Sequence, residues 1–592
     1  MRDKLYVYGN WSAYDELSDS IPLTEELAMR QLSELLRLRR AGVRFDAYLM
    51  DAFWYAKDGG YRTWRSDAWP DGPDRWLAAC QDNGLLPGLW FTVNTLMELD
   101  PVPAWRDSVD EKGWGMSLVS GGFLQDFMEV LSYWYRRGVR LFKFDFAEFG
   151  AVPARSEAEN PLPGPPPRGE GESAREGEGD SLKGEDIGSS AGEGVKGRNI
   201  AAFREALGEF RQEHPEAVLM AFNGFERREC MNRSDNPPGD FAYPTFEERE
   251  GMNGSDKPRG YYIDPAWLDV FDSIYCGDPR PSDLPAGSFW RSVDIYSDAM
   301  TRLFESSGIQ LRQIDNCGFM AGDTGTCYWR KKVGWKAMLL LSLARGGAIH
   351  VAYGDLGLFD EEDAAWWAEA QRLFGEPSYS FGGWPGDGEA YGWYCGDVIV
   401  AVNPSLVRQS LELWRGNWRI LCADHGALAF MDGRSASLAG GQVALLGKPS
   451  VRWEQSAYLD SSVDAAEPVF VADPAADVRQ FDTQWGAIRL VSEEPYFVDL
   501  DPTWGRIRVA VRQVDREGRA VRLWPSDDVP SVPIEVTLHS AEGARRLPPM
   551  IDRPIWSGVS WWVGDFDTPP GPARLEISAR SEAVRVQVLR IV

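Results

Sequence analysis

The chain has 592 residues, of which 44% are hydrophobic, and it carries a formal net charge of −28. This length exceeds that of one ordinary domain and predicts two or three. The negative charge argues against nucleic acid and anionic membrane surfaces as partners, and no stretch of the sequence is long and apolar enough to span a membrane.

The cysteines and histidines restrict the chemistry further. Seven cysteines are scattered without a Cys-x-x-Cys pair, and the first residues contain no apolar run of signal-peptide length. We therefore predict reduced thiols and a cytoplasmic location. The four histidines lie far apart in the sequence, which argues against a histidine-based metal site or a Ser/His triad. We expect no metal and no other cofactor, so that carboxylates are left to perform acid–base chemistry.

Strand-like and helix-like runs alternate through the first 375 residues. The strands are predicted at 5–11, 44–51, 86–93, 141–146, 217–223, 272–276, 309–316 and 347–353. The helices are predicted at 25–40, 74–83, 123–137, 200–213, 290–305, 329–344 and 361–374. Eight strands that alternate with helices predict an α/β fold, the (β/α)8 TIM barrel.

The active site of such a barrel lies at the C-terminal ends of its strands. Polar or aromatic residues stand at or near several of these ends: Asp51, Trp90, Asp145, Asn223, Cys276 and Asp315. Their convergence on one rim is a stronger signal than any single acid.

Two changes of composition divide the chain. Residues 151–197 are rich in Pro, Gly, Ser and Glu, and they predict a disordered insertion within a catalytic barrel over residues 1–380. After about residue 380, short apolar or alternating runs are separated by Gly, Pro and Asp turns. This pattern predicts C-terminal antiparallel β-sandwich domains, one at 381–470 and a second at 471–592.

The fourth predicted strand contains the most informative pair of residues. Lys143 and Asp145 are two positions apart, so their side chains share one face of the strand. A buried cation and carboxylate are costly unless they are compensated. Two interpretations stay open: a structural ion pair at a strand end, or a carboxylate nucleophile that its lysine keeps ionised.

Several segments, taken together, resemble the retaining α-galactosidases (melibiases) of glycoside hydrolase families 27 and 36. The matching segments are Asp51-Ala52-Phe53-Trp54, Gly88-Leu89-Trp90, Lys143-Phe144-Asp145, Trp290-Arg291-Ser292-Val293-Asp294 and, in place more than in letters, 314–323. The resemblance covers roughly residues 5–375. It departs at Ala52, where the family has a second acid that binds sugar hydroxyls.

The resemblance implies a role for each matched residue. Asp145 would be the nucleophile, Asp294 the acid/base, and Asp51 a ligand of the sugar hydroxyls. Lys143 would favour the ionised form of Asp145, whereas partial desolvation of Asp294 among Trp290 and apolar neighbours would raise its pKa. The two carboxylates should face one pocket at about the 5–5.5 Å separation of retaining enzymes.

Two interpretations stay open for several of the other predicted site residues. Trp54 and Trp90 could stack on the sugar or pack in the core. Asn223 could bind a sugar 2-hydroxyl or form a turn before Gly224. We expect Arg291 to hold a sugar hydroxyl or another acid. Asp294 could instead be a helix N-terminal acid. Two further acids are held in reserve: Asp298 and Asp315.

The function expected from these motifs is removal of terminal α-linked galactose-like sugars from oligosaccharides. Two alternatives remain: a transglycosylase of the same mechanism, and a non-catalytic carbohydrate-binding protein on the same scaffold. The expected partner is the oligosaccharide substrate, with no nucleic acid and no membrane, and the sequence leaves a homo-oligomer open.

Overall fold

The computed structural model describes the chain in segments. These are residues 4–11, 13–14, 22–153, 189–222, 225–227, 262–263, 265–275, 302, 314–315, 319–321, 335–346, 349–374, 378–383, 389–403, 408–414, 416–423, 429–439, 442–456, 459, 466–468, 488–491, 494–513, 534–547, 551–555, 559–579 and 584–591.

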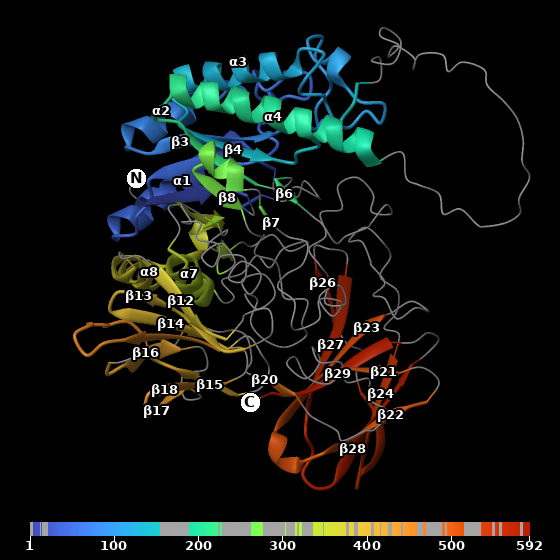
Figure 1. Cartoon of the computed structure of the whole chain (residues 1–592). Coiled ribbons are helices and arrows are strands. Elements are labelled where there is room, and N and C mark those ends of the chain that lie inside the picture. Colours follow the sequence, from blue (N-terminus) through green and yellow to red (C-terminus); the bar gives the residue numbers. More distant parts are fainter. Residues whose placement is uncertain are drawn as a thin grey trace, which may run out of the picture.

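A parallel sheet forms the N-terminal part of the structure (Figure 1). Its strands are β1 (Leu5–Gly9), β2 (Ala47–Met50), β3 (Leu86–Thr92), β4 (Leu141–Asp145), β5 (Val218–Ala221), β8 (Ser273–Tyr275), β9 (Ile314–Asp315), β10 (Phe319–Ala321) and β11 (Ile349–Gly354). Their order is β10-β11-β1-β2-β3-β4-β5-β8-β9, and every pairing within it is parallel. Each of the eight predicted strands overlaps one of these strands.

The two edges of this sheet belong to one stretch of chain. β9 pairs with β8 at one edge, β10 pairs with β11 at the other, and only residues 316–318 separate β9 from β10. The sheet with its outer helices is therefore the predicted (β/α)8 barrel, followed by antiparallel sheets.

The helices match most of the predicted ranges. They are α1 (Glu25–Arg40), α2 (Asp74–Asp82), α3 (Phe123–Arg136), α4 (Ser189–Glu213), α7 (Trp335–Ala344) and α8 (Glu361–Leu373), with short 3-10 turns at Arg106–Ser108, Pro265–Asp269, Leu356–Leu358 and Pro502–Trp504. The helix predicted over 290–305 lies outside the described residues except at Arg302.

A small two-stranded sheet also joins β6 (Glu226–Arg227) to β7 (Tyr262–Ile263).

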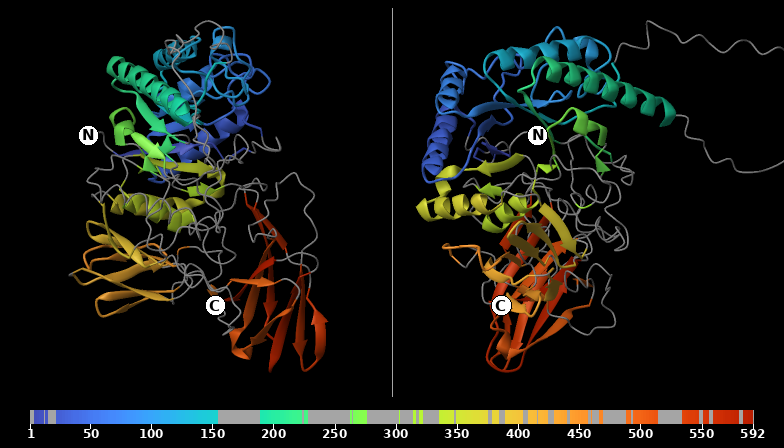
Figure 2. Two further views of the ribbon diagram at one scale, coloured as in Figure 1. Left: turned by 45° about the vertical axis from the view of Figure 1, so that its right-hand side comes forward. Right: turned by 60° about the vertical axis from the view of Figure 1, so that its left-hand side comes forward.

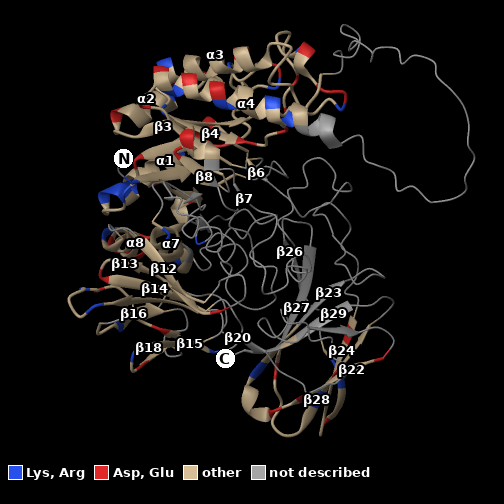
Figure 3. Ribbon diagram, in the orientation of Figure 1, with Lys and Arg blue, Asp and Glu red and all other residues tan. Residues whose placement is uncertain are grey.

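Helices α3 and α4 cover the outer face of the central strands (Figure 2). The Phe142 ring lies 5.5 Å from that of Phe210 on α4, and the Phe144 ring lies 5.9 Å from that of Phe203. Because side chains alternate along a strand, Lys143 and Asp145 point into the barrel. Acidic and basic residues occur along the ribbons of α3 and α4, the outer layer of the barrel (Figure 3).

Helix α4 corrects the predicted insertion at 151–197. The helix begins at Ser189 instead of Ile200, so the end of that range is helical, and residues 154–188 lie outside the described residues. Glycine-rich composition led to the later start. Once a helix is nucleated, each added residue gains a backbone hydrogen bond, which offsets the glycine penalty.

Two antiparallel sheets follow the barrel. The first contains β12 (Ser378–Gly382), β13 (Tyr391–Cys395), β14 (Val398–Val402), β19 (Val443–Gly447) and β16 (Arg419–Ala423); the second contains β15 (Gln409–Glu412), β18 (Ser435–Leu438) and β17 (Phe430–Asp432). One apolar core joins the two sheets as a sandwich. The other face of the first sheet, including Trp393 and Val400, belongs to the same core as the barrel.

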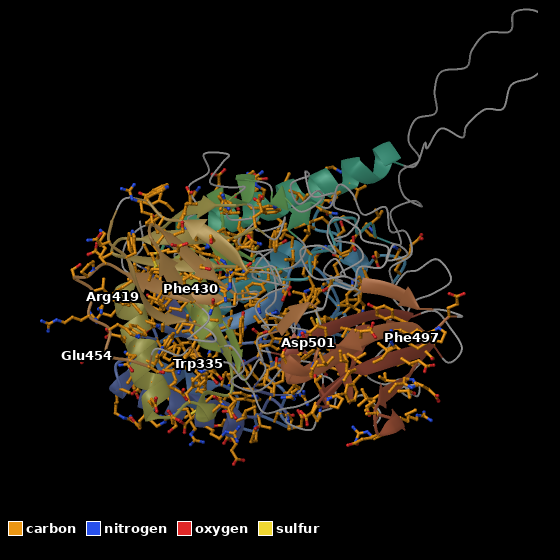
Figure 4. All side chains as sticks on the ribbon, turned by 90° about the horizontal axis from the view of Figure 1, so that it is seen from below. Trp335, Arg419, Phe430, Glu454, Phe497 and Asp501 are labelled. Carbon is orange, nitrogen blue, oxygen red and sulfur yellow. The ribbon has the colours of Figure 1, made fainter. Side chains whose placement is uncertain are left out.

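The C-terminal sheets have a core of their own. One contains β20 (Ala466–Pro468), β29 (Val584–Ile591), β23 (Arg506–Gln513), β27 (Val559–Asp567), β26 (Ile551–Ile555) and β21 (Ile488–Val491); the other contains β22 (Tyr496–Leu500), β28 (Ala573–Ala579), β24 (Ile534–Ser540) and β25 (Gly543–Arg546). Residues between Tyr496 and Val588 from both sheets pack together. Phe430 and Phe497 mark the two groups of sheets in Figure 4. The boundaries near 380 and 470 stay predictions.

The helices of the described residues are all too short or too polar to be membrane spans.

One buried side chain ties α4 to the loops above the barrel. The Asn199 side-chain oxygen accepts from the Leu118 N–H at 2.9 Å, and its amide nitrogen donates to the Phe149 and Ala151 carbonyls at 2.8 and 3.1 Å. Asn199 is fully buried. It therefore satisfies three backbone groups of the loops that follow β3 and β4.

We predict that Asn199→Ala lowers the free energy of unfolding of the barrel by roughly 3 kcal/mol or more, because each unpaired buried polar group costs about 1–3 kcal/mol. Denaturant titration followed by tryptophan fluorescence measures the loss. Glu205→Ala, at an exposed position on the same helix, is the control and should change stability by less than about 0.5 kcal/mol. Equal effects of the two substitutions would contradict this role of Asn199.

Candidate active site

Four of the residues singled out in the sequence meet inside the barrel at its C-terminal end. Asp145 ends β4, Asp51 follows β2, and Trp90 and Lys143 lie on β3 and β4 as register partners. All four are at least 95% buried. Three of the predicted strand-end residues, Asp51, Trp90 and Asp145, therefore lie together with Lys143, and their functional roles stay predictions.

Asp145 is held by two N–H donors. The Trp90 indole Nε1 donates to its Oδ2 at 3.1 Å, and the Phe146 backbone N–H donates to its Oδ1 at 3.0 Å. Phe146 has φ +50°, a left-handed conformation that side chains other than glycine rarely adopt. Such strain is retained where the surrounding structure enforces it, and here it accompanies a fixed carboxylate orientation.

Lys143 forms an ion pair with Asp51. Its Nζ lies 2.9 Å from the Asp51 Oδ2, and the two side chains are only 2% and 3% exposed. The Tyr353 hydroxyl lies 3.4 Å from the same nitrogen, and the Phe222 ring centroid lies 3.8 Å away. Alternation along the strand correctly predicted that Lys143 faces the barrel interior. The partner proposed for it from the sequence was Asp145. The ion pair with Asp51, which reaches across β3, was not predicted.

Asp51 is held through both its carboxylate and its backbone. Its Oδ1 accepts from the Ala52 N–H at 2.9 Å, and the Asp51 N–H donates to the Asn10 side-chain oxygen at 2.8 Å. Asn10 follows β1, and Tyr353 lies in β11. Sequence reasoning missed both, although each stands at the end of a predicted strand, which is the signal that could have found them.

Gly9 makes room for Tyr353 beside the ion pair. A Cβ atom at Gly9 would lie 2.5 Å from the Tyr353 ring, well inside van der Waals contact. Position 9 therefore needs glycine for the close approach of that ring, which in turn reaches Lys143.

The two tryptophans play different parts. Trp54 is completely buried, lies among the rings of residues such as Trp64 and Trp134, and donates its indole N–H to the Trp90 carbonyl at 2.9 Å. Trp54 therefore packs in the core, which is one of its two predicted alternatives. Trp90 instead contacts Asp145 and stacks on Tyr55, with ring centroids 6.1 Å apart.

Two buried tyrosines beside the site stay protonated at neutral pH. Burial raises the pKa of Tyr61 above its usual range, the hydrogen bonds of Thr92 oppose this, and the Asp145 charge adds to it. Burial likewise raises the pKa of Tyr55 well above 10, helped by the charges of nearby groups that include Asp51. Both hydroxyls therefore act as fixed dipoles and not as bases.

Several predicted site residues lie outside the described residues. They are Asp294, Arg291, Asn223, Cys276 and Asp298. Asp315 is placed only as a backbone position in β9. The spacing of the two carboxylates therefore stays a prediction. Within the described ranges, no group of three His, Cys, Asp or Glu side chains is arranged to hold a metal ion.

Comparison with known proteins yields similarities of structure only. No protein-family model matches the chain, and no curated protein matches it. A family 36 α-galactosidase from Geobacillus stearothermophilus has 11% identity and a TM-score of 0.45, over 75% of this chain and 55% of that one. The α-galactosidase of Lactobacillus brevis has 10% identity and a TM-score of 0.44, over 77% and 56%.

A putative α-galactosidase from Bacteroides fragilis has 12% identity and a TM-score of 0.40, over 75% of this chain and 78% of that one. The chain thus spans about half the length of the first two structures. These values describe a distant likeness of backbone arrangement, and they do not extend to the residues of the site.

We predict that Lys143→Met destabilises the barrel by about 3–5 kcal/mol, because the Asp51 carboxylate is then buried without its cation. The double substitution Lys143→Met with Asp51→Leu should recover most of this loss, since neither charge of the pair remains buried. Calorimetric melting of Lys143→Met, Asp51→Leu and the double variant measures the coupling.

An exposed pair provides the matched control. Lys448 lies 2.6 Å from Asp397, with side chains 41% and 59% exposed. Lys448→Met should therefore change stability by no more than about 1 kcal/mol. A double variant of the buried pair that is less stable than Lys143→Met alone would contradict the coupling.

Proposed function

We propose that this chain is a retaining glycoside hydrolase that removes terminal α-linked galactose-like sugars from oligosaccharides. Asp145 is the nucleophile and Asp294 the acid/base in this proposal. The reaction proceeds by double displacement, with a covalent glycosyl–Asp145 intermediate between two inversions at the anomeric carbon.

The observation that carries the proposal is the setting of Asp145. Its carboxylate stands at the C-terminal end of a central barrel strand, at the position where the catalytic groups of this fold lie. Two N–H donors, from Trp90 and Phe146, fix its oxygens and stabilise its negative charge. A nucleophile needs a fixed orientation and a negative charge, because an ionised oxygen must reach the anomeric carbon from the correct direction.

The ion pair of Lys143 and Asp51 supports recognition of a sugar. It lies buried in the same end of the barrel and offers a cationic donor beside an anionic acceptor. A sugar hydroxyl both donates and accepts hydrogen bonds, so such a pair can fix adjacent hydroxyls. Ala52, 6% exposed, adds no second carboxylate, so Asp51 is the acid that the end of β2 supplies, and Lys143 reaches it from β4.

The proposed reaction has two steps. Asp145 attacks the anomeric carbon while the Asp294 carboxylic acid gives its proton to the departing glycosidic oxygen. The Asp294 carboxylate then takes a proton from water, which attacks the same carbon and releases Asp145. The tyrosines Tyr55 and Tyr61 remain protonated throughout and exchange no proton in either step.

A panel of nitrophenyl α-glycosides tests the activity directly. We expect release of nitrophenol from the α-galactoside or a close stereoisomer. Products formed with added sugar acceptors distinguish hydrolysis from the transglycosylase alternative. Binding of a sugar without cleavage of any member of the panel would assign the non-catalytic alternative.

We predict different defects in the two acid variants. Asp145→Ala should lose on the order of 10⁴-fold or more in kcat on every substrate, because the covalent intermediate cannot form. Asp294→Ala should still react with an aryl glycoside in the first step, since a good leaving group needs no proton, and then stall. Steady-state and burst kinetics measure both effects, with Asp82→Ala, an exposed acid, as the unaffected control.

The configuration of the product formed with azide separates the two roles further. In Asp294→Ala, azide needs no base and should give a glycosyl azide of the substrate's own configuration after two inversions. In Asp145→Ala, azide can enter only through the space left by the nucleophile and should give the inverted product. Full activity of Asp294→Ala on an unactivated oligosaccharide would transfer the acid role to Asp298, and an active Asp145→Ala would sink the proposed mechanism.

A further inference from the structure

A cavity of about 420 Å³ lies beside the loop that follows β2. It is lined by Tyr14, Pro22, Leu23, Phe53, Tyr55, Ala56, Lys57, Arg65, Ser66, Asp67 and Glu98. Its volume falls within the range of small-molecule sites, about 300–1,000 Å³, and its lining combines aromatic with charged groups. None of the residues to which we assign catalysis lines it.

Backbone strain is concentrated in this lining. Phe53 has φ +69° and Glu98 has φ +54°, both in the left-handed region that favours glycine. The half-buried Phe53 side chain takes part in the wall of the cavity in spite of this cost. Strain of this kind persists where the surrounding structure enforces it, and here the ring also packs against the barrel core, so it is held in a fixed place in the wall.

The cavity adjoins the candidate active site. Phe53 is two residues from Asp51, and two residues of chain span at most about 7 Å. Tyr55, another lining residue, stacks on Trp90, which binds Asp145. The backbone of the cavity wall at Phe53 therefore lies within about 7 Å of that of Asp51, the acid of the ion pair with Lys143.

The charges at the cavity occur as pairs. Lys57 lies 2.7 Å from Glu98, and Arg65 lies 2.9 Å from Asp67. Two cations and two anions leave no net charge in this set, which disfavours an ionic ligand and suits a neutral one with many hydroxyls. Each pair presents a donor beside an acceptor, and the ring of Phe53 offers an apolar face.

We propose that this cavity binds the second sugar unit of the oligosaccharide, on the leaving-group side of the bond that is cleaved. The inference rests on the proposed function, because an enzyme that removes a terminal sugar places all further units on that side. The apolar face of the sugar ring packs on Phe53. The sugar hydroxyls form hydrogen bonds with two ion pairs, that of Lys57 with Glu98 and that of Arg65 with Asp67. The cavity thus favours oligosaccharides over single sugars.

The test measures sugar binding without turnover. Titration calorimetry with full-length Asp145→Asn compares galactose with melibiose, in which galactose is α-linked to glucose. We expect melibiose to bind about tenfold more tightly than galactose. Adding Phe53→Gly or Phe53→Ala to the Asp145→Asn variant should abolish this difference in affinity between the two sugars (the affinity gap). Adding Lys57→Gln should reduce the affinity gap. Phe430→Ala, an exposed aromatic residue on β17, should leave the affinity gap unchanged.

The two Phe53 variants also separate binding from folding. Both lack the ring, but Phe53→Gly relieves the left-handed strain that Phe53→Ala keeps, so Phe53→Gly should melt at the higher temperature while both lose the same selectivity. The inference would be overturned if Asp145→Asn bound both sugars equally. It would also be overturned if folded Phe53 variants still bound melibiose more tightly than galactose. Either result would leave the proposed function standing. Failure of both sugars to bind would overturn the two together.

Discussion

The buried ion pair between Lys143 and Asp51 is the constraint on which this end of the barrel depends. Two charges removed from water are tolerated only when their geometry and additional hydrogen bonds compensate the loss of solvation. The surroundings meet this requirement through the Ala52 N–H, the Tyr353 hydroxyl and the Phe222 ring. Those groups come from different parts of the barrel, so the pair fixes how the strands approach one another at the site.

Asp145 is not a partner in the ion pair of Lys143 and Asp51, but its orientation depends on the same arrangement. The pair occupies the barrel interior beside Trp90, whose indole then points its N–H at Asp145. The outer layer completes the restraint, because Phe142 and Phe144 lock β4 against α4 and set which residues face inward. The buried ion pair and the apolar packing outside the barrel thus restrain β4 together.

Periodicity made part of this structure predictable from the sequence, whereas contacts between residues distant along the chain were not predictable. Alternation along 141–146 assigned Lys143 and Asp145 to one face, and the order of strand-like and helix-like runs predicted the barrel. Periodicity specifies a face but no partner, so it could not show that Lys143 pairs with Asp51 at the end of another strand. The burial of Trp54 depends on rings contributed by several elements, and for that reason a single motif could not decide its role.

The first antiparallel sheet has a consequence for how this protein comes to be made. One face of β13 and β14 completes the core of the barrel, yet these strands are synthesised after every strand of the barrel itself. A ribosome adds about 5–20 residues per second, so the apolar surface around Trp366 and Trp335 waits several seconds for its cover. During that interval the nascent barrel resembles an aggregation-prone intermediate, and the speed of translation through residues 391–453 sets how long a chaperone has to shield it.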